Sequence, residues 1–448
     1  MLRYSQIFIR LVTAIIPFRS VRRQIRQRLM GCCREVWLSR TVPRVRKRDA
    51  ELERACRARL AAGNRLRVCF IVCDVSMFSA EPVYQAMCQD SRFEPFIAIV
   101  PRVSRGESFL RETLEKTVSV LSARYSGVRS LYDPDTRVAQ SLEGQADVVF
   151  TSVIYDDQTL ERYTALPLSR FALLACIPYV YSGLFKVNVK RTVFLPQIAL
   201  MWRIFLPTQQ TVDLWTECNP LLRGAAVLNG YVKMDRLAGI SVRSSRPKTV
   251  ILAPHHSLPS GTDSPLTLST FLTHADFFLK LPGLYPEIHF IFRPHPLLFT
   301  RLATSDWWGP ERVESYCKAM EAFPNVEFQR GGDYFDAFVN SDALIHDCGS
   351  FLAEYFYTGH PQCYLLADDA TIDREFLPFG KKLLEHVNRA YSSDEIRSFI
   401  ETVVLAGNDP GRQERDALAR KEVCVYHPYA AKRTIDDVFA GILGGSSY

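Results

Sequence analysis

A series of short apolar runs constrains the fold of this chain more than any other feature. In the first half they are residues 66–72, 96–100, 148–153, 171–177, 203–206 and 225–228. In the second half they are residues 249–253, 288–292, 326–328, 343–345 and 362–366. Such runs are typical of strands in a parallel sheet, because helices bury both faces of that sheet.

Stretches long enough to form helices lie between most of these runs. Apolar residues at helical spacing and closing glycines mark them. We predict helices at residues 80–90, 107–126, 212–218, 271–280, 333–341, 351–357, 393–406, 411–422 and 430–443. Alternating strands and helices predict an α/β protein with parallel sheets.

A change in composition divides the series in two, and the length of 448 residues also favours two domains. Residues 239–248 are polar and basic, which is typical of a linker. We predict an N-terminal domain over residues 66–238 and a C-terminal domain over residues 249–442, with about five strands in the second sheet. A separate segment, residues 1–60, precedes both domains.

Residues 1–48 differ from the rest of the chain in charge. They contain thirteen Lys or Arg and one acid, Glu35, a net charge of +12, whereas the whole chain carries +7. Apolar residues recur at helical spacing in the same segment: Ile7, Phe8, Leu11, Val12, Ile15 and Ile16. Such a segment is typical of a helix on an anionic membrane surface. We predict peripheral attachment to the cytoplasmic face of the cell membrane; the alternative is a helix packed on the protein's own surface.

The rest of the composition narrows the class of protein. Beyond residue 48 the chain carries a net charge of −5, which argues against a nucleic-acid groove across the fold. The apolar part of residues 1–48 is too short to span a bilayer and lacks a signal-peptide cleavage site. The twelve cysteines have no zinc-binding spacing, which indicates reduced thiols in a cytosolic protein.

The stretch Ser341–Leu366 combines a strand, a polar turn, a helix and a second strand. Gly349 in the turn lets the backbone approach a ligand, and the N–H groups at the helix start, with Ser350, favour an anion. Glu354 follows one helical turn later and suits a sugar hydroxyl. The pattern predicts a nucleotide site in which Asp347, Gly349, Ser350 and Glu354 bind the donor, although Asp347 and Ser350 are also residue types that cap helices.

Two further polar clusters follow strands in the second half: His255-His256-Ser257, and Arg293 with His295. Because the carboxyl ends of parallel strands meet at one edge, we expect all three clusters to lie together. Arginine can bind phosphate through two parallel hydrogen bonds, and a histidine beside a diphosphate can donate a hydrogen bond or transfer a proton. We predict that His295 is catalytic, that Arg293 contacts phosphate, and that His255 and His256 are further candidates between which the sequence does not choose.

The histidines and Asp347 lack metal-ligand spacing within any one element, so we predict no metal ion and no cofactor. Three motifs resemble the CDP-glycerol glycerophosphotransferase family, the teichoic-acid primases and polymerases: residues 254–257 (Pro-His-His-Ser), 293–296 (Arg-Pro-His-Pro) and 347–361 (Asp-Cys-Gly-Ser…Glu…Pro). Residues 229–237 are similar to that family's Gly-x-Pro-Arg-x-Asp-x-Leu segment, with Val232 and Lys233 in place of Pro-Arg. The resemblance covers roughly residues 66–440 and is denser in the second half.

This resemblance implies a GT-B fold, in which two Rossmann-like domains face each other across a cleft and the C-terminal domain binds an activated nucleotide donor. It also implies metal-independent transfer and attachment to the inner leaflet. By resemblance, His295 lies near the donor diphosphate, Gly349 and Ser350 hold phosphate, and Glu354 occupies the acidic position one turn further on.

One motif of the family is missing from the first half. Members carry Trp-His-Gly-x-Pro-Leu-Lys in the N-terminal domain, and its histidine is a candidate base. The nearest stretch here, residues 176–183 (Cys-Ile-Pro-Tyr-Val-Tyr-Ser-Gly), has no histidine. Either the base lies elsewhere, with Asp156 or Asp157 as candidates, or the acceptor chemistry differs.

The predicted function is transfer of glycerol phosphate, or a similar polyol phosphate, from a CDP-linked donor to a cell-envelope polysaccharide or a lipid-linked acceptor. One alternative is a GT-B glycosyltransferase that uses a UDP- or CDP-sugar for capsule or lipopolysaccharide. A nucleotide-sugar epimerase and a catalytically impaired, membrane-associated scaffold are the others. An epimerase needs no acceptor, so acceptor dependence separates it from the transferases.

Overall fold

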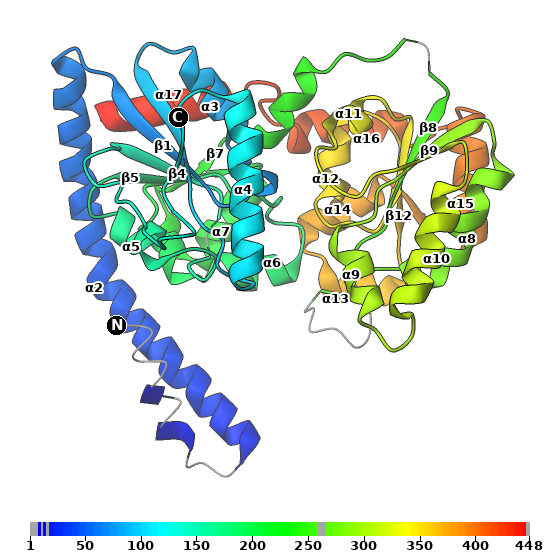
Figure 1. Cartoon of the computed structure of the whole chain (residues 1–448), viewed down its shortest axis with the longest axis horizontal. Coiled ribbons are helices and arrows are strands. Elements are labelled where there is room, and N and C mark those ends of the chain that lie inside the picture. Colours follow the sequence, from blue (N-terminus) through cyan, green and yellow to red (C-terminus); the bar gives the residue numbers. More distant parts are fainter. Residues whose placement is uncertain are drawn as a thin grey trace.

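The computed structural model describes residues 8–9, 12–14, 18–153, 155–244, 246–258 and 266–444. Two parallel sheets, each covered by helices, form two α/β bodies side by side (Figure 1). This arrangement confirms the predicted fold class. The exact domain boundaries stay predictions.

The N-terminal sheet has seven strands among the described residues, in the order β3-β2-β1-β4-β5-β6-β7, and every neighbouring pair is parallel. The strands are β1 (Leu66–Val72), β2 (Phe93–Ile99), β3 (Val128–Ser130), β4 (Val148–Thr151), β5 (Leu173–Cys176), β6 (Arg203–Leu206) and β7 (Ala226–Leu228). The sequence did not predict β3, because this edge strand has three residues and only Val128 is apolar.

The C-terminal sheet has six strands in the described part of the chain, in the order β10-β9-β8-β11-β12-β13, again all parallel. They are β8 (Lys248–Ala253), β9 (Ile288–Phe292), β10 (Val326–Phe328), β11 (Ala343–His346), β12 (Gln362–Leu365) and β13 (Asn388–Ala390). The extra strand over the predicted five is β13, another three-residue edge strand with little apolar character.

Helices connect the strands and cover both sheets (Figure 1). In the first half they are α2 (Arg19–Ala61), α3 (Glu81–Cys88), α4 (Glu107–Arg124), α5 (Ala165–Leu168), α6 (Lys186–Thr192) and α7 (Gln209–Cys218). In the second half they are α8 (Phe271–Leu284), α9 (Leu297–Ala303), α10 (Gly309–Glu321), α11 (Phe335–Val339), α12 (Phe351–Glu354), α13 (Asp369–Glu375), α14 (Pro378–Glu385), α15 (Ser393–Ser398), α16 (Arg412–Leu418) and α17 (Ala430–Leu443).

Several helices differ from their predictions. The helix expected over residues 351–357 ends as α12 at Glu354 and continues as a 3-10 turn, Tyr355–Thr358. The helices predicted at residues 393–406 and 411–422 begin as α-helices and finish as π-helical turns, Phe399–Leu405 and Ala419–Val423. Helices α9 and α10 were not predicted.

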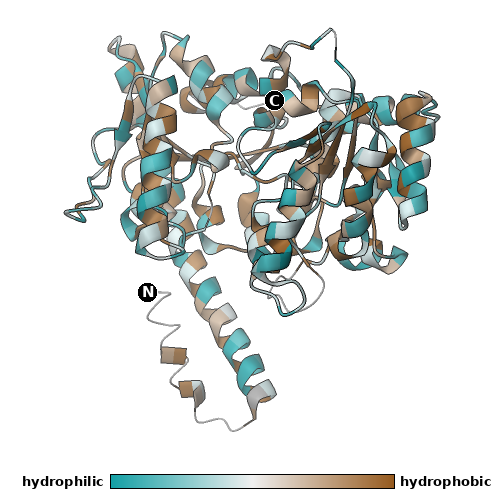
Figure 2. Ribbon diagram, turned by 45° about the vertical axis from the view of Figure 1, so that its right-hand side comes forward, coloured by the Kyte–Doolittle hydropathy of each residue, from teal (hydrophilic) through white to brown (hydrophobic). Residues whose placement is uncertain are grey.

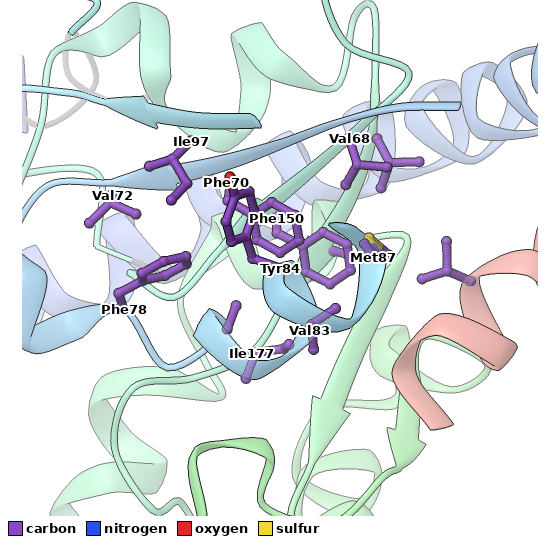
Figure 3. Close-up of a cluster of buried hydrophobic side chains, with 14 of the residues drawn as sticks. Val68, Phe70, Val72, Phe78, Val83, Tyr84, Met87, Ile97, Phe150 and Ile177 are labelled. Carbon is purple, nitrogen blue, oxygen red and sulfur yellow. The ribbon is translucent and has the colours of Figure 1, made fainter. Parts of the chain in front are cut away.

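The core of the N-terminal domain forms where strands β1, β2 and β4 meet α3 (Figure 3). Phe70 stacks on Phe150 with ring centroids 4.8 Å apart, and Tyr84 meets Phe70 edge-on at 5.5 Å. All three side chains are buried. Burying rings of this size contributes about 1.5–3 kcal/mol per side chain to folding.

The last helix, α17, returns to the N-terminal domain. Its apolar face, which includes Ile435, Val438 and Ile442, belongs to the same core as β1. Asp437 pairs with Arg203 of β6 at 3.0 Å. The end of the chain therefore ties the two domains together, although its sequence follows the second sheet.

Helix α2 has 43 residues and plays two roles along its length. Its later part packs on the N-terminal domain, where Val42, Val45 and Cys56 are buried. Its earlier part projects beyond the body of the protein and alternates hydrophobic with hydrophilic residues (Figures 1 and 2). Among the described residues, no helix has both the length and the apolar character that crossing a membrane requires.

Candidate functional site

The three predicted polar clusters lie at one edge of the C-terminal sheet. His255 and His256 follow β8, Arg293 and His295 follow β9, and the turn from Asp347 follows β11. Strands β9, β8 and β11 are direct neighbours and parallel. The rule that parallel strands end together therefore brings these clusters to the same edge, as the sequence predicted.

Three histidines form a compact group at this edge. The ring centroids of His256 lie 4.0 Å from His295 and 4.2 Å from His255. His255 and His295 are 5.3 Å apart, edge to face. One nitrogen from each ring lies within 4.8 Å of the others. The group can therefore address several oxygens of one phosphoryl group.

Asp347 fixes the turn that carries His255 and His256. Its fully buried carboxylate accepts hydrogen bonds from the backbone N–H of His255 at 2.5 Å, and from the N–H and hydroxyl of Thr270 at 2.6 and 3.0 Å. Burial raises the pKa of Asp347 to about 6. Asp347 thus ties the β11 turn to the β8 turn and to the start of α8.

Hydrogen bonds distinguish the three imidazoles. Nδ1 of His295 accepts from the backbone N–H of Leu297 at 3.1 Å, and Nδ1 of His255 accepts from the N–H of Ser257 at 3.3 Å. A backbone N–H can only donate, so the proton of the neutral His295 ring lies on Nε2, and His295 presents an N–H donor to a ligand. Nδ1 of His255 also lies 2.7 Å from the hydroxyl of Ser257, which can donate or accept, so Nε2 of His255 can be a donor or an acceptor.

His256 differs from both. Its Nδ1 is buried without a hydrogen-bond partner within the described residues. No contact of Nδ1 fixes the tautomer of this ring, so Nε2 can donate or accept. The cluster therefore combines one fixed donor, His295, with two rings whose tautomers are open.

Burial keeps the cluster neutral at physiological pH. It lowers the pKa of His256 to about 3, with smaller effects from His295 and Arg301, and the pKa of His295 to about 4. Burial, followed by its histidine neighbours, holds the pKa of His255 well below its ordinary value. An anionic ligand would offset these effects, because negative charge stabilises the imidazolium form.

The same bonds bear on metal binding. The nitrogens of His255, His256 and His295 are close enough to hold a metal ion. Metal binding at Nε2 of His295 would move its proton to Nδ1, where it would face the N–H donor of Leu297. His255 meets no such conflict, because its Nδ1–H could donate to the hydroxyl of Ser257. The conflict at His295 favours an anion over a cation at the cluster.

The guanidinium of Arg293 is hydrogen-bonded to the loop of residues 329–333 and is not free to point into the site. Its Nη1 donates to the side chain of Gln329 at 2.6 Å and to the carbonyl of Asp333 at 3.2 Å, and Nη2 donates to the carbonyl of Gly332. The side chain is only 8% exposed. Its predicted contact with phosphate stays a prediction.

Arg301 is a cation at the site that the sequence did not single out. It lies on α9, just after the His295 turn, and its Nη1 donates to the carbonyl of His256 at 3.3 Å. Burial and then the charge of Arg105 lower its pKa. The signal that could have found it is an arginine six residues after His295, but this required a prediction of α9.

The turn at Gly349 and Ser350 contacts the N-terminal domain. We call residues 181–186 the strap. The ring of Phe185 approaches Gly349 so closely that a Cβ there would lie 3.2 Å from its Cε2. The backbone N–H of Tyr181 donates to the hydroxyl of Ser350 at 3.4 Å. Protein atoms thus cover the turn predicted to hold phosphate, and that role stays a prediction.

More contacts fasten the strap to the C-terminal domain. The carbonyl of Leu184 accepts from the backbone N–H of Leu377 at 2.9 Å. Phe185 pairs with Phe376, with ring centroids 4.7 Å apart. The ammonium of Lys186 donates to the carbonyl of Asp373 at 2.6 Å. The stretch where a family histidine is missing therefore serves as an interdomain contact.

Glu354 lies at the centre of a second interdomain network. Its fully buried carboxylate accepts from the hydroxyls of Tyr334 at 2.5 Å and Tyr231 at 3.0 Å. Lys233 lies 3.4 Å from the same carboxylate. Burial, and then the nearby carboxylate, raises the pKa of both tyrosines well above its ordinary value, so they stay protonated donors. The residues that resemble the family's Gly-x-Pro-Arg segment thus contact its acidic position, and ribose binding by Glu354 stays a prediction.

The two candidate bases of the N-terminal domain follow β4. Asp156 lines a cavity of about 20 Å³ together with Tyr155 and Thr159. The carboxylate of Asp157 accepts from the amide of Gln158 at 3.4 Å. A cavity of this size has room for a water molecule but not for a sugar.

Comparison with known proteins shows the fold. No family model matches the chain, and no curated protein matches it in sequence. A UDP-GlcNAc 2-epimerase from Neisseria meningitidis bound to UDP-GlcNAc superposes with a TM-score of 0.53 at 14% identity, over 84% of this chain and 99% of that one. The wall teichoic acid polymerase TagF superposes with a TM-score of 0.54 at 12% identity, over 85% and 89%. At such identities the likeness establishes a GT-B fold and nothing more specific.

Proposed function

We propose that this protein is a GT-B transferase that moves glycerol phosphate, or a similar polyol phosphate, from a CDP-linked donor to a cell-envelope polysaccharide or lipid-linked acceptor. The observation that carries the proposal is the histidine cluster at the carboxyl ends of β8 and β9. The fixed N–H donor of His295 and the imidazole of His255, with Arg301 beside them, suit the diphosphate of such a donor. A TagF variant solved with CDPG, at a TM-score of 0.55 and 12% identity, shares the fold.

The chemistry requires stabilisation of a leaving nucleotide phosphate. Negative charge develops on the oxygen that bridges the two phosphates as its bond to the transferred group breaks. Donors already fixed by the protein stabilise this charge without reorganisation. The bonds from Leu297 to His295 and from Ser257 to His255 supply such fixed orientation.

Sugar transfer is the second candidate, since the fold also accommodates enzymes of UDP-sugars. An S. aureus MnaA–UDP co-structure matches with a TM-score of 0.51 at 12% identity, over 86% of this chain and 98% of that one. The fold therefore supports CDP-polyol and UDP-sugar donors equally. The motifs at residues 293–296 and 347–361 favour the CDP-polyol donor by resemblance.

An activity assay on the full chain separates the candidates. CDP-glycerol, CDP-ribitol, UDP-N-acetylglucosamine and UDP-glucose would be offered with and without a lipid-linked saccharide acceptor. Acceptor-dependent release of CMP supports the proposal, and acceptor-dependent release of UDP supports sugar transfer. Conversion of a UDP-sugar to its epimer without an acceptor contradicts both, and inertness toward every donor favours a scaffold.

We also propose that α2 attaches the protein to an anionic membrane surface. Phe18, the N-cap of α2, and Val21 and Leu29 on its projecting part are exposed apolar residues, and this part also carries several arginines. Each arginine near such a surface contributes about 1 kcal/mol. Full-length protein should sediment with phosphatidylserine vesicles but not with phosphatidylcholine vesicles, and replacing Phe18 and Val21 with Ser should weaken this binding. Equal binding to both vesicle types would contradict the proposal.

A further inference from the structure

The stretch that resembles the family's histidine motif offers the proposed transfer no imidazole as a proton acceptor on the N-terminal side. Residues 176–183, where family members carry a histidine, contribute instead to the strap. The acceptor hydroxyl must nevertheless lose its proton as it attacks. This raises the question of which group at the site can take that proton.

Contacts and burial separate the three histidines. The lone pair of the neutral His295 ring is on Nδ1, where the backbone N–H of Leu297 engages it, so this ring is fixed as a hydrogen-bond donor. Nδ1 of His255 contacts the N–H and the hydroxyl of Ser257, at 3.3 and 2.7 Å, and this residue is buried.

His256 is the remaining ring. Its Nδ1 is buried and has no hydrogen-bond partner among the described residues, so no contact of that atom fixes the tautomer and Nε2 can carry the lone pair. The ring is only partly buried, whereas His255 is 8% exposed. The groups that surround it are His255 on its own turn, His295 on the β9 turn and Arg301 on α9.

We propose that His256 is the general base of the transfer, and that it replaces from the donor domain the histidine missing from the N-terminal domain. This inference rests on the proposed function. The nitrogens of His256 and His295 lie within 4.8 Å of each other. Groups that act on the entering and leaving oxygens of an in-line displacement are about 3.5–4 Å apart in two-metal enzymes, a similar span.

The step balances without any further reactant. The acceptor O–H bond breaks, its oxygen bonds to the β-phosphorus of the donor, and its proton passes to the free lone pair of His256. The bond from the β-phosphorus to the bridging oxygen breaks, and its electron pair leaves on the nucleoside monophosphate. His295 Nε2–H donates to that leaving oxygen. The negative charge of the bound diphosphate stabilises the imidazolium that forms on His256.

The test compares full-length wild type with His256→Gln, using whichever donor of the panel above the wild type turns over. The expected result is a loss of kcat of at least about a hundredfold, the usual contribution of a general base. The Kd for that donor should not change. His289→Gln is the matched control, because His289 lies on β9 outside the cluster, beside Glu327.

Two further measurements separate a base from a structural residue. The rise of kcat with pH in the wild type, which reports the base in the complex with the donor, should be absent in His256→Gln, and added imidazole should restore turnover to His256→Gly. A kcat in His256→Gln within about tenfold of wild type would overturn the inference. So would activity lost on chelation and restored by Zn²⁺, since the cluster would then be a metal centre.

The same experiment tests the identity of the donor separately from the role of His256. A wild type that turns over only a UDP-sugar contradicts glycerol phosphate transfer, yet the same comparison on that sugar still tests His256. A wild type that turns over no donor overturns the proposed function and the base together. Turnover of CDP-glycerol with an unaffected His256→Gln variant overturns the base alone.

Discussion

The two sheets have the same architecture, but the loops at their carboxyl ends carry different kinds of residue. The loops after β8 and β9 carry the imidazoles of His255, His256 and His295, whose ring nitrogens are within reach of one another. The loop after β5 leads into the strap, where Leu184 and Phe185 are buried against the other domain. One edge carries reactive groups, and the other provides apolar contacts and backbone hydrogen bonds.

This difference indicates a division of labour between the domains. The strap brings the N-terminal domain against the β11 turn, where Phe185 contacts Gly349. Under the proposed function, the histidine cluster and Arg301 would be the partners of the donor phosphates. The candidate reactive groups lie in the C-terminal domain, and the strap of the N-terminal domain packs against it.

The largest expected effect comes from removing one donor of the C-terminal edge. His295→Asn keeps an acceptor for the N–H of Leu297 but removes the Nε2–H. Turnover should fall by at least about a hundredfold, because a fixed donor to the leaving oxygen is lost. Steady-state release of nucleotide from the donor measures this. A wild-type rate in His295→Asn would show that this ring takes no part in the reaction.

Removing the positive charge of Arg301 should have a smaller effect. Arg301→Met retains length and apolar contact on α9, and the Kd for the donor should rise roughly tenfold to a hundredfold, since hydrogen bonds to charged groups contribute about 1.5–3 kcal/mol. Calorimetry measures it. Arg312→Met is the control, because that guanidinium stacks on Trp308 instead. Equal Kd values for all three proteins would exclude Arg301 from the site.

Gly380→Ala, on α14 of the C-terminal domain, should disturb the contact between that domain and the strap. A Cβ at Gly380 would lie 2.5 Å from the carbonyl of Leu184 and 3.0 Å from Phe376. The free energy of unfolding should fall by about 1–3 kcal/mol, the usual cost of overpacking, although alanine ordinarily stabilises a helix. Denaturant unfolding measures it. Gly411→Ala meets nothing within 4 Å and serves as the control; a stabilised Gly380→Ala would show that the strap is loose.

The histidines of the C-terminal edge should make the free energy of unfolding fall as the pH is lowered. Burial lowers the pKa of His256 to about 3, and the pKa of His295 and His346 to about 4. The unfolded chain therefore binds more protons than the folded chain between pH 6.5 and pH 4, and stability falls as the pH falls, by about 1.4 kcal/mol per pH unit for each such proton. Asp347, with a pKa raised to about 6, partly offsets this loss because its folded form binds the proton.

The free energy of unfolding measured at pH 7, 6, 5 and 4 tests this sign. His256→Gln removes one titrating ring whose Nδ1 has no hydrogen-bond partner among the described residues, so its curve should be shallower by about one proton. A stability that rises as the pH falls would show that Asp347 outweighs the histidines.

The sequence predicted the fold wherever local signals were strong. Residues 66–72 are strand β1 as predicted, because seven mostly apolar residues leave little ambiguity. Strands β3 and β13 escaped prediction because pairing at a sheet edge, rather than apolar pattern, defines them. Likewise, nothing local to Ala430–Leu443 shows that this helix packs on the first domain.

The site was predicted as far as topology determines it. Parallel strands that end together were enough to bring His255, His256 and His295 to one place. The contact of Phe185 with Gly349 joins residues far apart in the chain, and no local pattern encodes it. The different roles of the three rings depend on backbone N–H groups, which only coordinates reveal.

The most direct test of the central claim, that the histidine cluster binds a nucleotide-diphosphate donor as an anion, is calorimetric titration of the full chain with CDP-glycerol, with and without EDTA. The account predicts binding that EDTA does not change, tighter than binding of CMP, and weakened in Arg301→Met. Preference for UDP-N-acetylglucosamine would move the protein to sugar transfer. The absence of binding to any nucleotide, or binding that EDTA abolishes, would contradict the account.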